Sequence, residues 1–232
     1  MSIKSIGSKS IYSIKSIQFT EKLTLKKRLE IANLINKIIK NYKILDVLDV
    51  GTTKETGYCD NIIVKNLLNV KKFKSISNVI IKDPFFEIIS KNSITNELSQ
   101  KYINKLKSDL VISNATIEHV GNLQHQIKMM QNIIKLTKKI FIISTPNRYF
   151  PIEFHTKIPL IHFFPKKIHR CLLKLFGFHF FSKEKNLNLL SEKDLLLIMN
   201  KFKNEIKYKI KTIKLFNIKS NLILIGKKIE LF

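Results

Sequence analysis

The stretch that most constrains this chain is residues 43–57, which read KILDVLDVGTTKETG. Residues 44–50 are apolar enough to be buried on both faces, as the strands of a parallel sheet are. The run then breaks into Gly51 and two threonines. In a parallel α/β sheet such a junction lies at the carboxyl edge, where ligands bind and the next helix N-terminus favours negative groups. Asp49-Val50-Gly51 is therefore a candidate nucleotide-binding signature, although the same pattern also occurs in simple tight turns.

Helical and strand-like patterns alternate along the chain. Apolar residues recur at helical spacing in residues 24–40 and 124–136, and buried strands are expected at 78–81, 109–113 and 140–144. This alternation predicts a mostly parallel sheet with right-handed crossovers. One domain is expected over residues 24–232, following an N-terminal extension at 1–23.

The C-terminal part follows a different pattern. Ser191 and Asp194 form a capping box for a helix over residues 192–202. Two strands are then expected around residues 208–213 and 221–226, separated by a short loop near Asn217. That loop is too short for a crossover helix, so the two strands should be antiparallel.

A second strand end is expected just before Asp83. Residues 71–77 read as a basic loop, and Pro84 prevents the strand at 78–81 from continuing. In doubly wound sheets an acid at the end of the second strand commonly binds ribose hydroxyls, but an aspartate before proline is equally ordinary in a turn. Residues 85–107 show little periodicity, with a short third strand expected near Ile94.

Residues 146–188 form a lid-like insertion rich in Phe, Pro and His. Residues 158–164 and 168–181 combine apolar clusters with Lys and Arg. This pattern suits short amphipathic helices over a pocket, or a surface that touches lipid headgroups. The lid interpretation is favoured because the segments are short and lie beside the predicted carboxyl edge.

The charge balance points to nucleic acid or an anionic membrane, since 42 Lys and Arg face 17 acids and the net charge is +25. The excess is mostly lysine spread along the whole chain beside Ile and Asn, which an A+T-rich coding sequence also produces. Cys59 and Cys171 are far apart and without metal-ligand spacing, which favours a cytoplasmic protein without disulfides. No apolar run approaches the roughly 18 residues of a membrane span.

Three motifs in chain order resemble the class I S-adenosylmethionine-dependent methyltransferases, and within them the type 11 group. KILDVLDVGTT is similar to their first motif, SDLVISNATIEHVG to a fourth-strand motif, and ISTPNRYFPIEFHT to a signature after the fifth strand in one bacterial subset. The resemblance covers residues 44–226 and implies a Rossmann-like fold with S-adenosylmethionine as cofactor. The usual first motif is glycine-rich, whereas Thr53 and Glu55 stand where further glycines are expected.

The resemblance also implies roles for single residues. Six would bind the cofactor: Asp49, Gly51, Thr52, Asp83, Asn114 and Ala115. Gly51 would let the backbone approach the ligand closely because glycine has no Cβ. Asp83 would hold the ribose hydroxyls, while Asn114 and Ala115 would lie near the methionine portion. On this interpretation Asp49 and Asp83 flank one crevice.

The reaction would transfer a methyl group to oxygen, nitrogen or carbon, mainly by holding two atoms in near-attack geometry. His155 is the first candidate base, oriented by Glu153, because imidazole titrates near neutral pH. These two residues share a face on a strand but not on a helix. His119 is the second candidate base, or a packing residue at a helix start. Arg148 and Tyr149 are candidates for binding the acceptor, with Arg148 facing an anionic group or a lid acid.

The leading hypothesis is a methyltransferase acting on a small molecule, a lipid-like precursor or a cell-envelope sugar intermediate. An RNA methyltransferase is the alternative that the charge favours. A non-catalytic module that docks to a membrane or partner through residues 158–181 is the third. No metal is expected, because His162, His169 and His179 lack ligand spacing and an accompanying acid cluster. The oligomeric state is left open.

Overall fold

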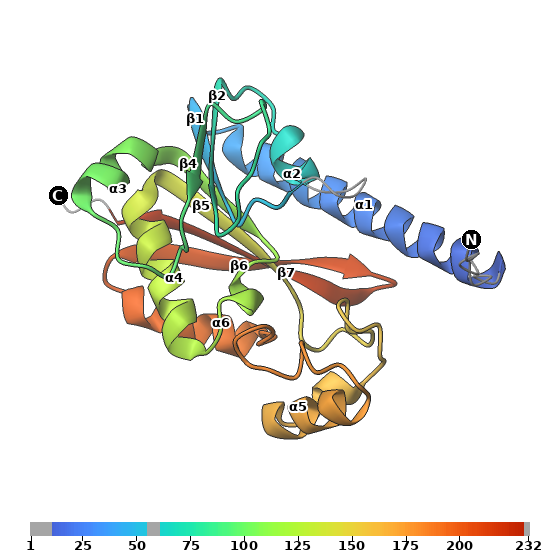
Figure 1. Cartoon of the computed structure of the whole chain (residues 1–232). Helices are drawn as coiled ribbons and strands as arrows, with labels where there is room; N and C mark the ends of the chain where they lie inside the picture. Colours follow the sequence, from blue (N-terminus) through green and yellow to red (C-terminus); the bar gives the residue numbers. More distant parts are fainter. Residues whose placement is uncertain (1–10, 55–60, 230–232) are drawn as a thin grey trace, which may run out of the picture.

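The computed structural model describes residues 11–54 and 61–229, with side chains from residue 22 onward. Seven strands in these ranges form one sheet in the order β3-β2-β1-β4-β5-β7-β6 (Figure 1). The strands are β1 (Asp46–Val50), β2 (Lys72–Ser77), β3 (Ile88–Lys91), β4 (Ser108–Asn114), β5 (Thr137–Pro146), β6 (Ile206–Leu215) and β7 (Ile218–Lys228). Strands β1 to β5 are parallel, and β7 is antiparallel to both neighbours. The predicted α/β class with a terminal antiparallel pair is confirmed.

Helices cover both faces of the sheet (Figure 1). Helices α1 (Ile11–Ile39) and α2 (Ile62–Lys65) pack on one face, while α3 (Gln100–Leu106), α4 (Leu123–Leu136) and α6 (Glu192–Met199) pack on the other. Helix α4 buries Met129, Met130 and Ile133 completely, as its apolar spacing predicts. The capping box of Ser191 and Asp194 is present at the start of α6. Among the described residues, no helix has the length and apolar character that crossing a membrane needs.

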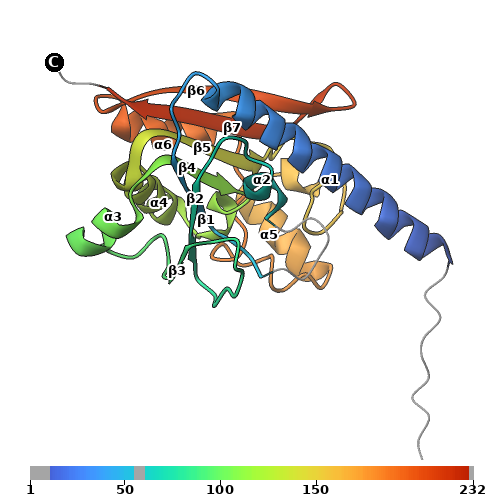
Figure 2. The same ribbon diagram turned by 90° about the horizontal axis from the view of Figure 1, so that it is seen from above.

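Helix α1 is longer than its apolar stripe predicts. It begins at Ile11 rather than near Thr24 and therefore runs across the predicted boundary of the N-terminal extension. Its C-terminal half buries Ile31, Ala32 and Ile35 against the sheet. Its N-terminal half projects beyond the sheet (Figure 2). The division of the chain at residue 23 stays a prediction.

The second strand was predicted in the wrong place. Residues 72–77, expected as a basic loop, are β2, and residues 78–81 are not a strand. Lys74 is buried inside β2, where its ammonium group lies 2.7 Å from Asp46 Oδ2. The buried ion pair and the small side chains of Ser75 and Ser77 remove the apolar signal that a central strand usually carries. The third strand lies at Ile88–Lys91, before Ile94, and α3 was not predicted.

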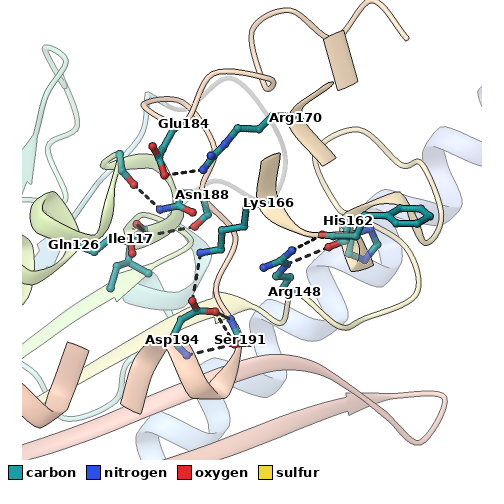
Figure 3. Close-up of polar contacts among 12 residues, drawn as sticks. Ile117, Gln126, Arg148, His162, Lys166, Arg170, Glu184, Asn188, Ser191 and Asp194 are labelled. Atoms are coloured by element: carbon teal, nitrogen blue, oxygen red, sulfur yellow. Dashed lines mark hydrogen bonds and ion pairs between the residues drawn. The ribbon is translucent and has the colours of Figure 1, made fainter. Parts of the chain in front are cut away.

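The insertion (residues 147–190) leaves the sheet after β5 and returns at Leu190, which pairs with Asn147. It contains the short 3₁₀ helix η2 (Ile161–Phe163) and helix α5 (Lys166–Leu175), which lies apart from the sheet (Figure 1). Figure 3 shows ion pairs that stabilise the insertion, one with α6 and one within the insertion itself. Lys166 pairs with Asp194 of α6 at 3.3 Å, and Arg170 pairs with Glu184 at 2.7 Å.

Candidate functional site

A pocket of about 540 Å³ opens at the carboxyl ends of four parallel strands. Residues 51–54 follow β1, residues 76–79 end β2, and residues 92–95 follow β3. The fourth wall follows β4 and consists of Ala115, Thr116, His119 and Val120. This is the edge of a doubly wound sheet where ligands bind, so the pocket lies where the sequence predicted a site.

Gly51 is required by the packing of the two loops that meet behind this pocket. Its φ angle is +91°, a backbone conformation that favours glycine. A Cβ added here would lie 2.1 Å from Thr116 Oγ1 and 2.9 Å from Thr116 Cβ. Gly51 therefore lets the loop after β1 pack directly on the loop after β4, in addition to lying on the pocket wall.

Asp49 lies behind the wall of this pocket. Its carboxylate is buried and accepts a hydrogen bond of 2.7 Å from Thr52 Oγ1, which in turn accepts one of 2.8 Å from Ser75 Oγ. Burial raises the pKa of Asp49 to about 6, although the Thr52 hydrogen bond opposes the shift. Asp49 lines a second, smaller pocket of about 120 Å³ together with Asn114.

The other residues predicted for the cofactor site divide between the two pockets. Gly51 and Ala115 line both, Thr52 lines only the larger pocket, and Asn114 lines only the smaller one. Asn114 Oδ1 accepts a hydrogen bond of 2.5 Å from Ser144 Oγ, which fixes its orientation. The loop residues Glu55 and Gly57, like Cys59, lie outside the described residues, whereas Cys171 is a free, exposed thiol.

Asp83 is not at the end of the second strand, so the expectation that it shares a crevice with Asp49 is wrong. Strand β2 ends at Ser77, and the chain then turns back before Asp83. The Asp83 carboxylate accepts from the backbone N–H of Phe85 and pairs with Lys65 at 3.0 Å. The ring of Phe85 packs on Phe73, near the amino end of β2, with 4.4 Å between ring centroids. Asp83 lines neither pocket.

The pocket walls at the ends of β2 and β3 were not predicted as site residues. Asn78, which is exposed, directly follows β2, and Asn92 directly follows β3. Recognising residues 72–77 as a strand would have placed Asn78 at a strand end. That recognition depends on pairing Lys74 with Asp46, which lie 28 positions apart.

The predicted catalytic residues Glu153, His155 and His119 come together at the edge of the larger pocket. His155 Nδ1 lies 2.5 Å from Glu153 Oε1, and His119 Nδ1 lies 2.7 Å from the carbonyl oxygen of Asn186. The Nε2 atoms of the two histidines are 3.0 Å apart. His119 belongs to the 3₁₀ helix η1 (Ile117–His119) after β4, whereas His155 comes from the insertion.

The electrostatics of this cluster follow from burial and from the Glu153 carboxylate. Burial raises the pKa of Glu153, but the hydrogen bonds and charge of His155 outweigh it and lower the pKa to about 2. Burial lowers the pKa of His155, but the hydrogen bond and charge of Glu153 outweigh it and raise the pKa. Glu153 is therefore a carboxylate that orients the His155 ring through its Nδ1–H group.

Glu118, which was not among the residues predicted for the site, adds a carboxylate to this cluster. Potential ligand atoms of Glu118, His119 and His155 all lie within 4.8 Å of one another, a spacing compatible with a metal ion. The expectation of no metal considered His162, His169 and His179, none of which belongs to this group. What brings the three residues together is the folding of the insertion back onto η1, where the Asn188 N–H donates to the Glu118 carbonyl at 2.7 Å.

Arg148 and Tyr149, predicted to bind the acceptor, line neither pocket. Arg148 is buried and donates from Nε to the carbonyl oxygen of His162 at 3.0 Å and from a terminal nitrogen to that of Phe164 at 2.6 Å (Figure 3). Its partners are thus insertion carbonyls, neither an acceptor anion nor a lid acid. Tyr149 is half exposed, and its ring contacts Phe163.

The fold is shared with solved methyltransferase structures. The N-methyltransferase NodS from Bradyrhizobium japonicum WM9 in complex with S-adenosylhomocysteine has a TM-score of 0.51 and 8% identity, with 89% of this chain and 88% of NodS covered. Magnesium protoporphyrin IX methyltransferase (ChlM) from Synechocystis PCC 6803 with bound S-adenosylhomocysteine has a TM-score of 0.50 and 13% identity, covering 96% and 89% of the two chains.

This chain has the class I methyltransferase fold. The small RNA methyltransferase HEN1 matches with a TM-score of 0.56 and 13% identity over 99% of this chain, which spans only 27% of HEN1. No protein-family model and no curated protein matches the sequence. At these identities the likeness concerns the methyltransferase fold alone.

Proposed function

We propose that this protein is an S-adenosylmethionine-dependent methyltransferase that activates its acceptor at the cluster of Glu118, His119, Glu153 and His155. The observation that carries the proposal is that His119 lines the large pocket and also contacts His155. A cofactor pocket and a group able to bind or deprotonate an acceptor thus share one residue. A methyltransferase needs this adjacency, because its two reacting atoms must be held in near-attack geometry.

The pocket residues fit an adenosyl ligand in size and polarity. The volume of the large pocket, about 540 Å³, lies within the usual range for small-molecule sites. Asn78 and Asn92 stand at the ends of β2 and β3, and an amide side chain both donates to and accepts from ribose hydroxyls. This assignment replaces the predicted role of Asp83. Gly51 and Thr52 line the pocket on the side of β1, and we assign them the cofactor contacts that the resemblance implies.

Bound S-adenosylmethionine supplies an electrophilic methyl group, so that the acceptor lone pair forms the new bond while the carbon–sulfur bond breaks and its electron pair stays on sulfur. The chain contributes the position of the acceptor and a route for its proton. His119 faces the pocket, and His155 and Glu153 stand behind it. The insertion also covers part of His155, since the ring of Phe181 packs on it with 5.6 Å between the ring centroids.

We favour a small molecule, a lipid-like precursor or a cell-envelope sugar intermediate as acceptor, because the insertion beside the cluster exposes aromatic and aliphatic side chains. RNA is a second candidate, supported by the net charge of +25 and by the likeness to HEN1. If RNA is the acceptor, its affinity falls steeply with added salt as counterions are released. Absence of RNA binding at low salt excludes it.

Isothermal titration with S-adenosylhomocysteine tests the cofactor site. The protein should bind one equivalent, and Asn78→Ala should weaken binding about fivefold, since a lost hydrogen bond to a ligand is worth on the order of 1 kcal/mol. Asp83→Ala is the matched control and should leave the affinity unchanged, because Asp83 lines neither pocket. An affinity that depends on Asp83 and not on Asn78 would contradict this placement.

A further inference from the structure

We infer that Glu118, His119 and His155 form a binding site for a first-row divalent cation at the edge of the large pocket. The evidence for the site itself comes from the positions of these three side chains and their neighbours. Its role, binding and activating an acceptor hydroxyl, rests on the proposed methyltransferase function.

The hydrogen bonds behind the two histidines fix which ring nitrogen faces the site. A carbonyl oxygen can only accept, so His119 must donate through Nδ1 to Asn186. His155 likewise donates through Nδ1 to the Glu153 carboxylate. Metal-binding histidines almost always donate their second ring N–H to a carboxylate or a backbone carbonyl. Both histidines here have that arrangement, and each turns its Nε2 toward the other.

Two neutral rings in these tautomers would place two Nε2 lone pairs 3.0 Å apart with nothing between them. Such an arrangement is repulsive unless a positive species lies at the junction. Two imidazole nitrogens bound to one zinc ion lie about 3.0 Å apart at a right angle and about 3.4 Å apart at the tetrahedral angle that zinc prefers. The observed separation is therefore compatible with a shared cation, and it is also that of an N–H···N hydrogen bond between the rings. A proton held between the rings is the competing explanation.

The buried carboxylate of Glu118 supports a cation independently of the two histidines. The residue has no exposed surface, and its Oε1 atom has no hydrogen-bond partner among the described residues. Its other oxygen accepts from Thr145 Oγ1 at 2.9 Å, which fixes the carboxylate. Leaving a buried carboxylate oxygen without a partner is costly, and a cation would satisfy it. The three ligand atoms span at most 4.8 Å, close to the roughly 4.2 Å between opposite ligands of one such ion.

The ligand set also indicates the class of metal. Two imidazoles and one carboxylate suit zinc, manganese, cobalt, nickel or iron, whereas magnesium and calcium prefer oxygen ligands. Three protein ligands leave coordination positions open. Because His119 lines the pocket, an acceptor oxygen could occupy an open position, where the cation would lower the pKa of its hydroxyl group.

Titration of the metal-stripped 232-residue protein with Zn²⁺, and in parallel with Co²⁺ followed by visible absorption, tests the site. We expect one tight equivalent and a cobalt spectrum typical of nitrogen and oxygen ligands. His155→Gln and Glu118→Gln should each weaken Zn²⁺ binding at least tenfold. Glu153→Gln, which changes the acceptor of the His155 Nδ1–H group and also the partner of Thr156, should weaken it about 10- to 100-fold. His179→Ala is the matched control, since His179 is exposed and outside the cluster, and it should bind like the wild type.

Far-ultraviolet circular dichroism and S-adenosylhomocysteine titration on the same variants separate the possible failures. If the folded wild type binds no stoichiometric Zn²⁺, or if His155→Gln and Glu118→Gln bind as the wild type does, the cation site is wrong and a shared proton explains the contact. If Zn²⁺ binds as expected but S-adenosylhomocysteine does not, the cation site stands and the methyltransferase proposal fails.

Discussion

Asp49 is an acid whose burial opposes the ionisation of its carboxyl group at neutral pH. It is buried at the end of β1, and its only side-chain donor in the described structure is the Thr52 hydroxyl. Burial in such surroundings disfavours the ionised form, which explains the raised pKa of about 6. A carboxylate retained at a stability cost is more typical of a functional position than of a packing position.

Asp49→Asn should stabilise the protein at pH 7 and have little effect at pH 4. The folded-state pKa of about 6 exceeds the ordinary 3.8, so the native state binds more protons and wild-type stability falls as the pH rises through this window. The asparagine still accepts from Thr52 and removes a cost of about 2 to 3 kcal/mol at pH 7. Urea unfolding at both pH values measures this. An equal gain at both, or a loss at pH 7, would show that desolvation of Asp49 is not the cause.

Gly51→Ala should destabilise the protein by about 2 to 4 kcal/mol, through the left-handed backbone and through overpacking on Thr116. Gly177→Ala is the matched control: Gly177 also has a positive φ, +81°, but a Cβ there meets nothing within 4 Å. It should cost only the backbone part, about 1 to 2 kcal/mol. Thr116→Ala should recover part of the Gly51→Ala loss in a double-mutant cycle. Equal costs for the two glycines would argue against the contact with Thr116.

At the scale of elements, the strongly apolar segments could be predicted from the sequence and the polar ones could not. An apolar pattern that can be recognised from the sequence alone is present in strands β1, β4 and β5, in helix α4 and in the antiparallel pair of β6 and β7. Strand β2 does not, because its interior holds Lys74 and two serines whose partners come from other strands and loops. Mistaking β2 for a loop moved the expected strand end from Ser77 to Asp83.

Within the insertion, the hydrogen bonds of Arg148 should hold the start of the insertion against η2. Arg148→Met removes the donors to the buried His162 carbonyl and to the partly exposed Phe164 carbonyl, and an unsatisfied buried group costs about 1 to 3 kcal/mol. We expect lower hydrogen-exchange protection in residues 150–164 and a lower Tm. Arg170→Met, which removes an exposed ion pair with Glu184, is the control and should cost less than about 1 kcal/mol. Similar effects of the two changes would contradict this role of Arg148.

At the scale of the whole molecule, the site depends on contacts between distant segments. His119 and Glu153 with His155 could be proposed separately from two motifs, but their meeting could not, because it requires the insertion to return to η1 through Asn186 and Asn188. The carboxyl edge of the sheet then gathers the ends of β1 to β4 around one pocket, with this cluster on its rim. The high positive charge needs no role in this arrangement, although it remains the basis of the RNA alternative.

The most direct test is a crystal structure of the 232-residue protein grown with S-adenosylhomocysteine. The proposed cofactor site predicts density for the ligand in the large pocket, with its ribose near Asn78, its adenine beside residues 92–95, and its sulfur toward the His119 side. Density near Asp83 and Lys65 instead, or no ligand at a concentration that saturates binding in solution, would contradict it.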